Sequence, residues 1–579
     1  MPHVPPWRDR YASFRDRIAA KRAGRAKTTT QFTMQPEPRN IGLVAKGRQL
    51  VAGDILVAGQ RAKQPQRSIW DIAIDQPAAT ADLHGCDWLD DLAALGDPPA
   101  RATAQAWVFD WITRYGAGTG PGWQAAVTAQ RLTNWINHSD FLLRGQNKRK
   151  AATFYQSLAR QSLFLASRCQ STPPGLPRIT ALAGAIHAGL MLEGQSAHVD
   201  RAVVAFTKTC LDHTATDGTV RSRNPEELLN VLSYMTTVAQ VLQSAGRPVP
   251  AAISDMITRI VPTLRALRHA DSSLARFHGG GPGAEGMLES TLALTGVKTP
   301  ATPGLAMGYA RLIGGRTTLI VDAAAPPMGA ASRDAHASTL GIELTSGRRP
   351  LIVNCGSGAQ FGDDWRRASR ATPSHATLGL DGISSSHLGA VETDWLTQVP
   401  STVRAEMGTD SSGQKLNLSH NGYQPSHGLT HARLLHLSRD GRRLTGEDLL
   451  TTLDKGDEQT FDHVFDQTLR AGVSFAIRFH LHPDVTLAVT RDNGAVTLWL
   501  KSGEIWVFQH DGAAQLTISP SVYLENGQLK PRATQQVVLS GNALAYATRI
   551  RWSLAKAENT PLAVRDLAGA FPLDVADQT

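Results

Sequence analysis

The stretch GGGPGAEGMLESTLALTGVKTPATPG, residues 279–304, decides the fold of this chain, because the hydrophobic pattern differs on its two sides. It is rich in glycine and proline, as is typical of a break between structural units. Before it, apolar residues recur at helical spacing, and after it they alternate with polar residues over short segments. We therefore place a domain boundary near residue 300.

The region from about residue 85 to 300 is predicted to be a series of helices joined by short turns. Its clearest helix begins at Asn224-Pro225-Glu226-Glu227, which combines a favoured N-cap, a favoured first residue and two acids at the positive helix end. Successive antiparallel helical hairpins build either a closed α/α toroid or an open solenoid. The helical pattern alone does not distinguish these two architectures. The predicted helices cover residues 101–115, 122–143, 149–168, 177–192, 197–213, 225–245, 250–268 and 283–294.

Residues 301–579 are predicted to form a large antiparallel β-sandwich, because short alternating segments follow one another with turn residues between them. The predicted strands include Thr317 to Val321, Leu340 to Leu344, Leu351 to Val353, and Val485 to Val489 joined through Asp492-Asn493-Gly494 to Val496 to Leu500. Residues 1–84 are predicted to be an arm with a few short strands, among them 53–59 and 68–72. The expected fold class is α+β with several domains.

Composition sets broad limits on the class of protein. With 579 residues, 42% hydrophobic and 19% charged, the chain is an ordinary globular protein of two or three domains. The net charge is +9, and the basic segment from Arg8 to Lys27 is interpreted either as a solvated arm or surface helix or as a contact for a polyanion. The basic and aromatic clustering of a nucleic-acid binder is missing, so we expect no nucleic-acid partner.

Cysteine usage and hydropathy bear on location. The four cysteines lack the spacing of a zinc site and are predicted to be buried or free thiols: Cys86, Cys169, Cys210 and Cys355. No apolar segment is long enough to predict a membrane span, and the N-terminus lacks the apolar core of a secretory signal. These observations predict a cytoplasmic protein.

Three segments of the β region carry a resemblance to a known family. They are Asp334-Ala335-His336-Ala337-Ser338, Pro350-Leu351-Ile352-Val353-Asn354-Cys355-Gly356 and Ser374-His375-Ala376-Thr377-Leu378-Gly379-Leu380-Asp381-Gly382. Together with the order of helices before strands, they resemble the heparinase II/III-like polysaccharide lyases. The resemblance covers nearly everything from about residue 85 and is most specific from about 310 to 385.

That resemblance implies a fold, a reaction and a location. The fold is an α/α toroid, an incomplete helical barrel, over residues 85–300, followed by the β-sandwich over 301–579. The reaction is β-elimination on an acidic polysaccharide that contains uronate. Lyases resembling this chain work in the periplasm or cell envelope, which conflicts with the cytoplasmic prediction.

β-Elimination requires groups that neutralise the uronate carboxylate, remove the C5 proton and protonate the leaving oxygen. The resemblance implies that Asn224 and Arg223 hold the carboxylate and that His336 lines the cleft. His278, near the position of the family's catalytic tyrosine, and Tyr423 are the candidates for proton transfer. From the residues alone, Asn224 is equally an N-cap, and a packed side chain whose hydroxyl bonds a turn is the favoured interpretation of Tyr423.

Three more residues complete the predicted substrate-binding set. Arg276 lies in the same segment as His278. Trp365 and Arg370 belong to an arginine-rich segment that is interpreted either as a basic rim facing a polyanion or as solvated surface.

His336, Asn354 and His375 are the predicted ligands of a divalent metal, zinc or calcium, in the β-sandwich. The alternative is that the two histidines only satisfy the backbone of turns. Asp334 stands where many relatives have histidine, and Asn354 stands where aspartate is usual. A neutral amide is a poorer ligand than a carboxylate, so these departures weaken the metal prediction.

Three functions remain open at this stage. The first is a lyase acting on an acidic polysaccharide, and the second is a carbohydrate-binding or envelope-associated protein of the same fold that has lost turnover. The third is a glycoside hydrolase, which needs two carboxylates, and Glu226, Glu227 and Glu285 are the nearest acids. The sequence does not indicate an oligomeric state.

Overall fold

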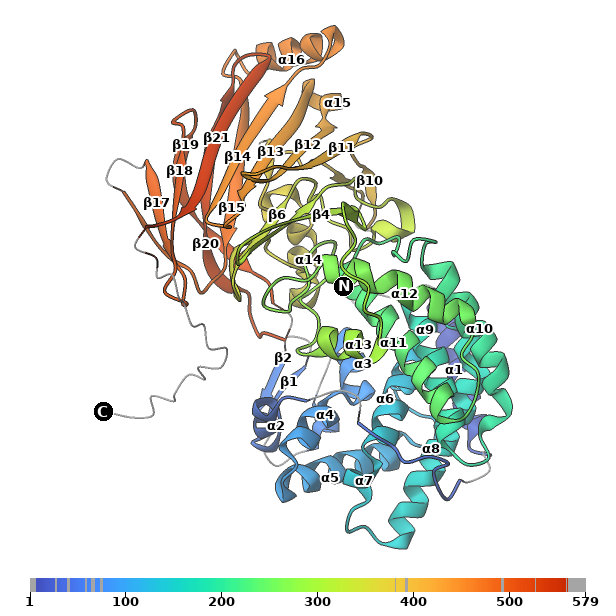
Figure 1. Ribbon diagram of the computed structural model, residues 1–579. Helices are drawn as coiled ribbons and strands as arrows, with labels where there is room; N and C mark the ends of the chain where they lie inside the picture. Colours follow the sequence, from blue (N-terminus) through green and yellow to red (C-terminus); the bar gives the residue numbers. More distant parts are fainter. Residues whose placement is uncertain are drawn as a thin grey trace, which may run out of the picture.

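The computed structural model describes residues 7–25, 29–38, 42–57, 60–63, 68–72, 77–380, 382–390, 394–490, 494–525, 527–558 and 560. Figure 1 shows a helical domain below a domain of long antiparallel strands. The first strand of the second domain is β3 (Leu305–Ala306). The predicted toroid and β-sandwich are confirmed.

The helical domain contains α3 to α13, and the predicted helices match them apart from their ends. The predicted helix 122–143 is two helices, α6 and α7, separated at His138, whose ring contacts Asp90 Oδ1 at 2.6 Å. The bounds are α3 (Pro77–Gly85), α4 (Trp88–Leu95), α5 (Pro98–Tyr115), α6 (Ala125–Asn137), α7 (Ser139–Leu143), α8 (Lys148–Arg168), α9 (Leu176–Met191), α10 (Val199–His213), α11 (Pro225–Ser244), α12 (Ala251–Ala266) and α13 (Met287–Thr295).

The N-terminal segment is more helical than predicted. It contains α1 (Trp7–Ala23), α2 (Val44–Val51) and one hairpin, β1 (Asp54–Val57) with β2 (Gln60–Lys63). The predicted strand at 68–72 is wrong, because Ile69–Asp71 is a 3-10 helix capped by Ser68, and it buries Trp70 against the toroid. Helix α1 lies on α8, where Arg168 Nε donates to Asp16 Oδ1 at 2.6 Å.

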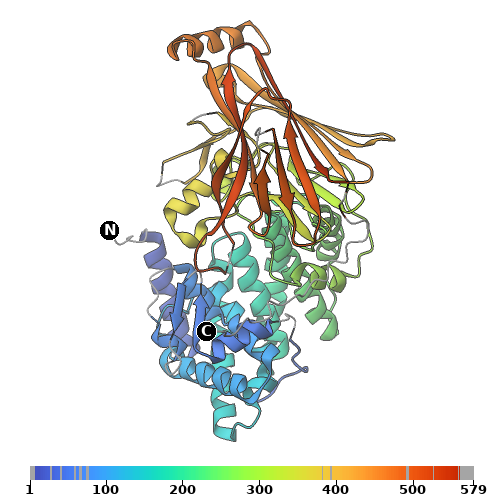
Figure 2. The same ribbon diagram turned by 90° about the vertical axis from the view of Figure 1, so that its left-hand side faces the viewer.

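The second domain consists mainly of two antiparallel sheets packed face to face, as Figure 2 shows. The first has the order β11-β12-β13-β14-β21-β18-β17-β16, and the second has the order β19-β20-β15-β7-β6-β5-β4-β3, with β8 paired to β15. Side chains alternate between core and solvent along strands such as β14, which gives the period of two seen in the sequence. The predicted turn at 492–494 lies largely outside the described residues.

The remaining strands and helices of this domain are β4 (Tyr309–Gly314), β5 (Thr317–Asp322), β6 (Ile342–Ser346), β7 (Arg349–Val353), β8 (Leu378–Leu380), β9 (His387–Leu388), β10 (Leu396–Gln398), β11 (Val403–Thr409), β12 (Gly413–Tyr423), β13 (Leu429–Ser438), β14 (Arg443–Thr451), β15 (Val473–Leu481), β16 (Thr486–Val489), β17 (Ala495–Trp499), β18 (Ile505–His510), β19 (Gln515–Tyr523), β20 (Arg532–Ala543) and β21 (Ala547–Lys556), with α14 (Asp363–Ser369), α15 (Gln424–His427) and α16 (Lys455–Gln467).

A buried polar network joins the two layers of the sandwich. Asp448 accepts hydrogen bonds from His431 Nε2 and Arg433 Nε, both at 2.7 Å, and from Trp552 Nε1 at 2.8 Å. Arg433 also donates to the carbonyl oxygens of Leu340 and Ala376, which lie on the other layer. Because every partner is satisfied, the buried charges are compensated and hold the layers in register.

Candidate functional site at the domain junction

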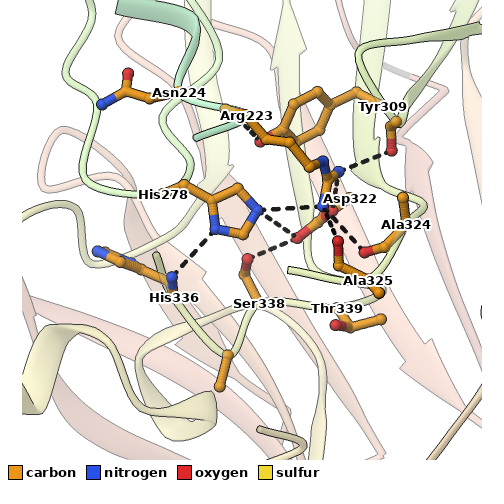
Figure 3. A network of polar contacts seen from close by, with 12 residues as sticks. Arg223, Asn224, His278, Tyr309, Asp322, Ala324, Ala325, His336, Ser338 and Thr339 are labelled. Atoms are coloured by element: carbon orange, nitrogen blue, oxygen red, sulfur yellow. Dashed lines mark hydrogen bonds and ion pairs between the residues drawn. The ribbon is translucent and has the colours of Figure 1, made fainter. Parts of the chain in front are cut away.

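The toroid meets the sandwich through two loops, 221–224 before α11 and 269–283 between α12 and α13. Figure 3 shows the side chains that these loops direct at the strands β4 and β5 and the segment 324–339. Arg223 and His278 both adopt a left-handed backbone, with φ of 55° and 48°. This conformation is costly for residues with a Cβ atom, and the surrounding contacts must hold it.

Arg223 is completely engaged inside the junction. Its Nη2 pairs with the buried Asp322 Oδ1 at 2.6 Å, and its guanidinium lies 4.6 Å from the ring centre of Tyr309. The Tyr309 hydroxyl donates back to the Arg223 carbonyl at 2.6 Å. The remaining N–H groups bond the carbonyl oxygens of Met307, Gly308, Ala324 and Ala325 at 2.9–3.1 Å. All five guanidinium donors therefore have acceptors, and none is left for a substrate carboxylate.

His278 is buried beside this ion pair. Its Nδ1 accepts a hydrogen bond from the backbone N–H of His336 at 3.1 Å, which places the proton of the neutral ring on Nε2. Nε2 faces Asp322 Oδ2 at 3.5 Å and Arg223 Nη1 at 3.3 Å. Burial, and then the charge of Arg223, hold the pKa of His278 well below its ordinary value. The imidazole is thus a neutral part of the junction.

Asn224 is the N-cap of α11. Its Oδ1 accepts from the backbone N–H groups of Glu226 at 2.9 Å and Glu227 at 3.2 Å. In Figure 3 its amide points away from Arg223 and His278. The two acids are also engaged, since Glu226 accepts from Gly281 N at 2.7 Å and Glu227 pairs with His213 at 2.9 Å.

His336, Asn354 and His375 do not fit a divalent metal. The rings of His336 and His375 lie 5.1 Å apart, and His336 Nδ1 and both nitrogens of His375 are buried without a hydrogen-bond partner. Asn354, however, uses its Oδ1 to accept from Ala376 N at 2.9 Å and its Nδ2 to face Glu343 Oε1 at 3.3 Å. Within the described part of the chain, no group of three or more His, Cys, Asp and Glu side chains could hold a metal ion.

Tyr423 lies in the core of the sandwich, away from the junction. It is fully buried, and its hydroxyl donates to Leu378 O at 3.0 Å. This is the packing alternative considered for Tyr423, and it separates the hydroxyl from any saccharide.

Trp365 and Arg370 differ from each other. Arg370 is buried and donates to the carbonyl oxygens of Ala335 and Ser332, both at 2.8 Å, and to Asp394 Oδ1 at 2.7 Å. It therefore braces the segment that carries His336. Trp365 is partly exposed on α14, so of these two only Trp365 is available at a rim.

Arg276, two residues before His278, lines a cavity of about 250 Å³ between the domains. Its guanidinium is nine-tenths buried and lies 4.3 Å from the ring centre of Tyr523. The His482 ring stands 5.0 Å from the Tyr523 ring, edge to face. The backbone N–H of Arg276 donates to Glu343 Oε2 at 3.0 Å, which fixes the loop on β6.

The cavity contains acidic as well as basic side chains, since Asp271, Glu343, Asp484 and Glu525 line it together with Arg276 and Arg349. Burial, and then the charge of Arg276, lower the pKa of His482 to about 4, so its imidazole is neutral at pH 7. Burial raises the pKa of Tyr523, which keeps its hydroxyl protonated. Although burial raises it, the hydrogen bond from His269 and the charge of Arg276 hold the pKa of Glu343 below its usual range.

Sequence reasoning missed five residues of the junction: Tyr309, Asp322, Glu343, His482 and Tyr523. The only sequence signal for Asp322 was an acid directly after the apolar strand Thr317 to Val321. For Tyr523 and His482 no local signal exists, since they lie more than 200 residues from Arg276.

Comparisons with known proteins define the class. Residues 296–553 match the family "Heparinase II/III-like, C-terminal". A crystal structure of heparinase III aligns with a TM-score of 0.64 at 12% identity, covering 94% of this chain and 89% of that one. A mutant of the heparan sulfate lyase HepC from Pedobacter heparinus aligns with a TM-score of 0.55 at 13% identity, covering 96% and 89%. These matches show that the chain shares the fold of both structures, a helical toroid followed by a β-sandwich.

Over its second domain, the chain is similar to the heparinase II/III-like family. It is also similar to FtsZ-localized protein C of Caulobacter vibrioides (strain NA1000 / CB15N), with 29% identity over 527 residues that cover 89% of this chain and 88% of the relative. No helix among the described residues is both long and apolar enough to cross a membrane.

Proposed function

We propose that this protein acts by binding rather than by β-elimination, and that it works together with FtsZ on the cytoplasmic side of the cell. The proposal of binding instead of elimination rests on the network of Arg223, His278 and Asp322, whose polar atoms bond one another and the backbone. We call it the closed network. The name of the Caulobacter relative, which spans nearly the same length of chain, supports the association with FtsZ. Under this proposal, the protein is located in the cytoplasm and not in the periplasm or cell envelope.

The chemistry of the closed network argues against elimination at that place. An eliminating site needs a free donor for the carboxylate and an accessible base and acid. The guanidinium of Arg223 donates to backbone carbonyl oxygens and to Asp322. One ring nitrogen of His278 accepts from the backbone N–H of His336, and the other faces Asp322. These groups hold the two domains together instead.

Co-sedimentation with FtsZ polymers tests this proposal. We expect the purified protein to pellet with polymerised FtsZ and to stay in solution with unpolymerised FtsZ. A fluorescent fusion in the native host is expected to coincide with FtsZ. A diffuse fusion together with no co-sedimentation would reject the association.

A second candidate function is supported by the cavity at Arg276. A guanidinium, a neutral imidazole and a protonated phenol are the three groups that elimination beside a uronate requires. Arg276 would neutralise the carboxylate, His482 would take the C5 proton, and Tyr523 would protonate the leaving oxygen. The volume of about 250 Å³ suits one sugar ring.

The Tyr523→Phe variant separates this candidate from the first. If the cavity eliminates, the wild-type protein forms unsaturated uronate and the variant loses nearly all of that rate. If the cavity only binds, neither protein forms product, and both retain affinity for a uronate oligosaccharide measured by calorimetry. Loss of affinity in Arg276→Ala, with an unchanged melting temperature, would locate the ligand in this cavity.

A further inference from the structure

The end of the sandwich farthest from the toroid carries exposed apolar side chains. Figures 1 and 2 both place α16 there. Leu469 is 92% exposed, Leu453 is 66% exposed, Leu544 is 60% exposed and Tyr546 is 40% exposed. Contacts join their segments, because Thr452 N donates to Tyr546 O at 3.0 Å, and Tyr546 packs on Phe461 of α16 with ring centres 5.7 Å apart. We call this region the distal tip.

Acids outnumber bases around these apolar side chains. Asp454, Asp462 and Asp466 are exposed on or beside α16, as are Lys455 and Arg470, and Glu458 is half-buried. Asp466 pairs with Arg470 at 3.4 Å, while Asp462 accepts a hydrogen bond from the Tyr546 hydroxyl at 2.9 Å. Apolar groups on an exposed surface with a polar and charged rim are typical of a protein-binding surface.

The complementary surface lies on α1. Tyr11 and Phe14 are 56% and 59% exposed. At 100° per residue, Arg15, Ile18 and Arg22 share their face of the helix. The helix is held by its other side, where Ala20 and Ala23 are buried and Asp16 pairs with Arg168. This exposed side is therefore basic and aromatic.

We propose that the distal tip of one chain binds the exposed side of α1 of a second copy. Charge complementarity selects this occupant, because the tip is acidic around apolar groups and α1 is basic around aromatic groups. Helix α1 has 17 residues and α16 has 13, so the two helices can lie along each other over a similar length. The two surfaces belong to different domains and cannot meet within one chain, as Figures 1 and 2 show. The contact is head to tail, so it repeats from one copy to the next and builds either a ring or a filament.

Sedimentation velocity at low ionic strength, over a series of protein concentrations, tests this contact. We expect species larger than one chain that grow with concentration and shrink in high salt, since exposed charges are screened. Leu469→Asp and Phe14→Asp each remove an exposed apolar contact, so each is expected to give a single chain. Unchanged circular dichroism and melting temperature check that both variants are folded.

A charge-reversal pair gives the sharpest control. The variant D462K/D466K has a basic tip, and the variant R15E/R22E has an acidic α1. Each alone is expected to stay a single chain, because its own two surfaces now repel. An equimolar mixture is expected to assemble, because each altered surface meets its complement.

Several outcomes would overturn the head-to-tail contact. One is a single chain at all concentrations in low salt, and another is assembly that Leu469→Asp leaves unchanged. A third is failure of the mixture to assemble. Binding of the wild type to anionic phospholipid vesicles, lost in Phe14→Asp while Leu469→Asp behaves like the wild type, would assign α1 to a membrane surface instead.

Discussion

The two polar clusters at the domain junction share the toroid loop 269–283, yet they differ in which of their polar groups lack protein partners. In the first cluster, Arg223 and His278 use their polar atoms on Asp322 and backbone groups. In the second, Arg276 stacks on Tyr523 beside a cavity, with His482 next to it. Residue types suited to catalysis are therefore structural in one cluster and available in the other.

This difference teaches that a residue's type predicts its role only when we know which of its hydrogen-bonding groups have partners within the protein. Arg223 and Arg276 were equivalent candidates in the sequence. Their contacts separate them, because a buried guanidinium with five acceptors stabilises the fold, whereas one that lines a cavity can bind a ligand.

The largest expected effect of substitution falls on the closed cluster. Arg223→Ala leaves Asp322 buried without its ion partner, which we expect to lower the free energy of unfolding by about 3–5 kcal/mol. Denaturant unfolding measures this. Arg276→Ala is the matched control, since its guanidinium borders a cavity that water can fill. Equal losses in the two variants would contradict the distinction between the clusters.

Acid is expected to destabilise the protein through its buried neutral histidines. Burial lowers the pKa of His480 to about 4 from an ordinary value of 6.5. Between these two pH values, His480 is protonated in the unfolded chain and neutral in the folded protein. The free energy of unfolding therefore has its full value above pH 6.5 and decreases as the pH falls toward 4. The expected decrease due to His480 is on the order of 2 kcal/mol near pH 5. His278 shifts in the same direction.

Melting temperatures measured from pH 7 to about pH 5 check this acid dependence. The His480→Gln variant is expected to show a shallower fall than the wild type, because it removes one group that must stay neutral. A melting temperature that rises on acidification would contradict the assignment of these histidines as neutral.

A moderate effect is expected in the open cluster, on ligand affinity and not on stability. Arg276→Lys keeps the charge but loses the planar stacking on Tyr523, so we expect uronate affinity to fall roughly tenfold, about 1.4 kcal/mol. Calorimetric titration measures it. An unchanged affinity would place the ligand elsewhere.

The smallest effect is expected at the rim. Trp365 is partly exposed on α14, so Trp365→Ala should change the unfolding free energy by less than about 0.5 kcal/mol. Arg370→Ala nearby should cost several times more, because Arg370 is buried and bonds three partners. Thermal unfolding of the pair compares them, and equal costs would mean that Trp365 is also structural.

Much of the fold could be predicted because its signals are local. The cap at Asn224-Pro225 and the change of period near residue 300 depend on neighbouring residues. The N-terminal segment was less readable, since Ile69–Asp71 alternates like a strand and becomes a 3-10 helix when Trp70 is buried by the toroid.

The site could be predicted only in part. Segment resemblance located Arg223, Arg276, His278 and His336 near one another, and all four lie at the junction. The resemblance could not show which of these side chains have all their polar groups bonded within the protein. The acceptors of Arg223 come from the sandwich, about 100 residues away in the sequence. Tyr423 was misleading for the same reason, since only the packed sandwich reveals that its hydroxyl bonds Leu378 O.

The most direct test of the account is an elimination assay on the purified wild-type protein. Samples of several uronate-containing polysaccharides are incubated with it and followed by the ultraviolet absorbance of unsaturated uronate, with a known lyase as the positive control. The account predicts no increase in absorbance on any polymer, while binding to FtsZ polymers is retained. A steady increase that disappears in the Tyr523→Phe variant would contradict it and establish the cavity at Arg276 as an active site.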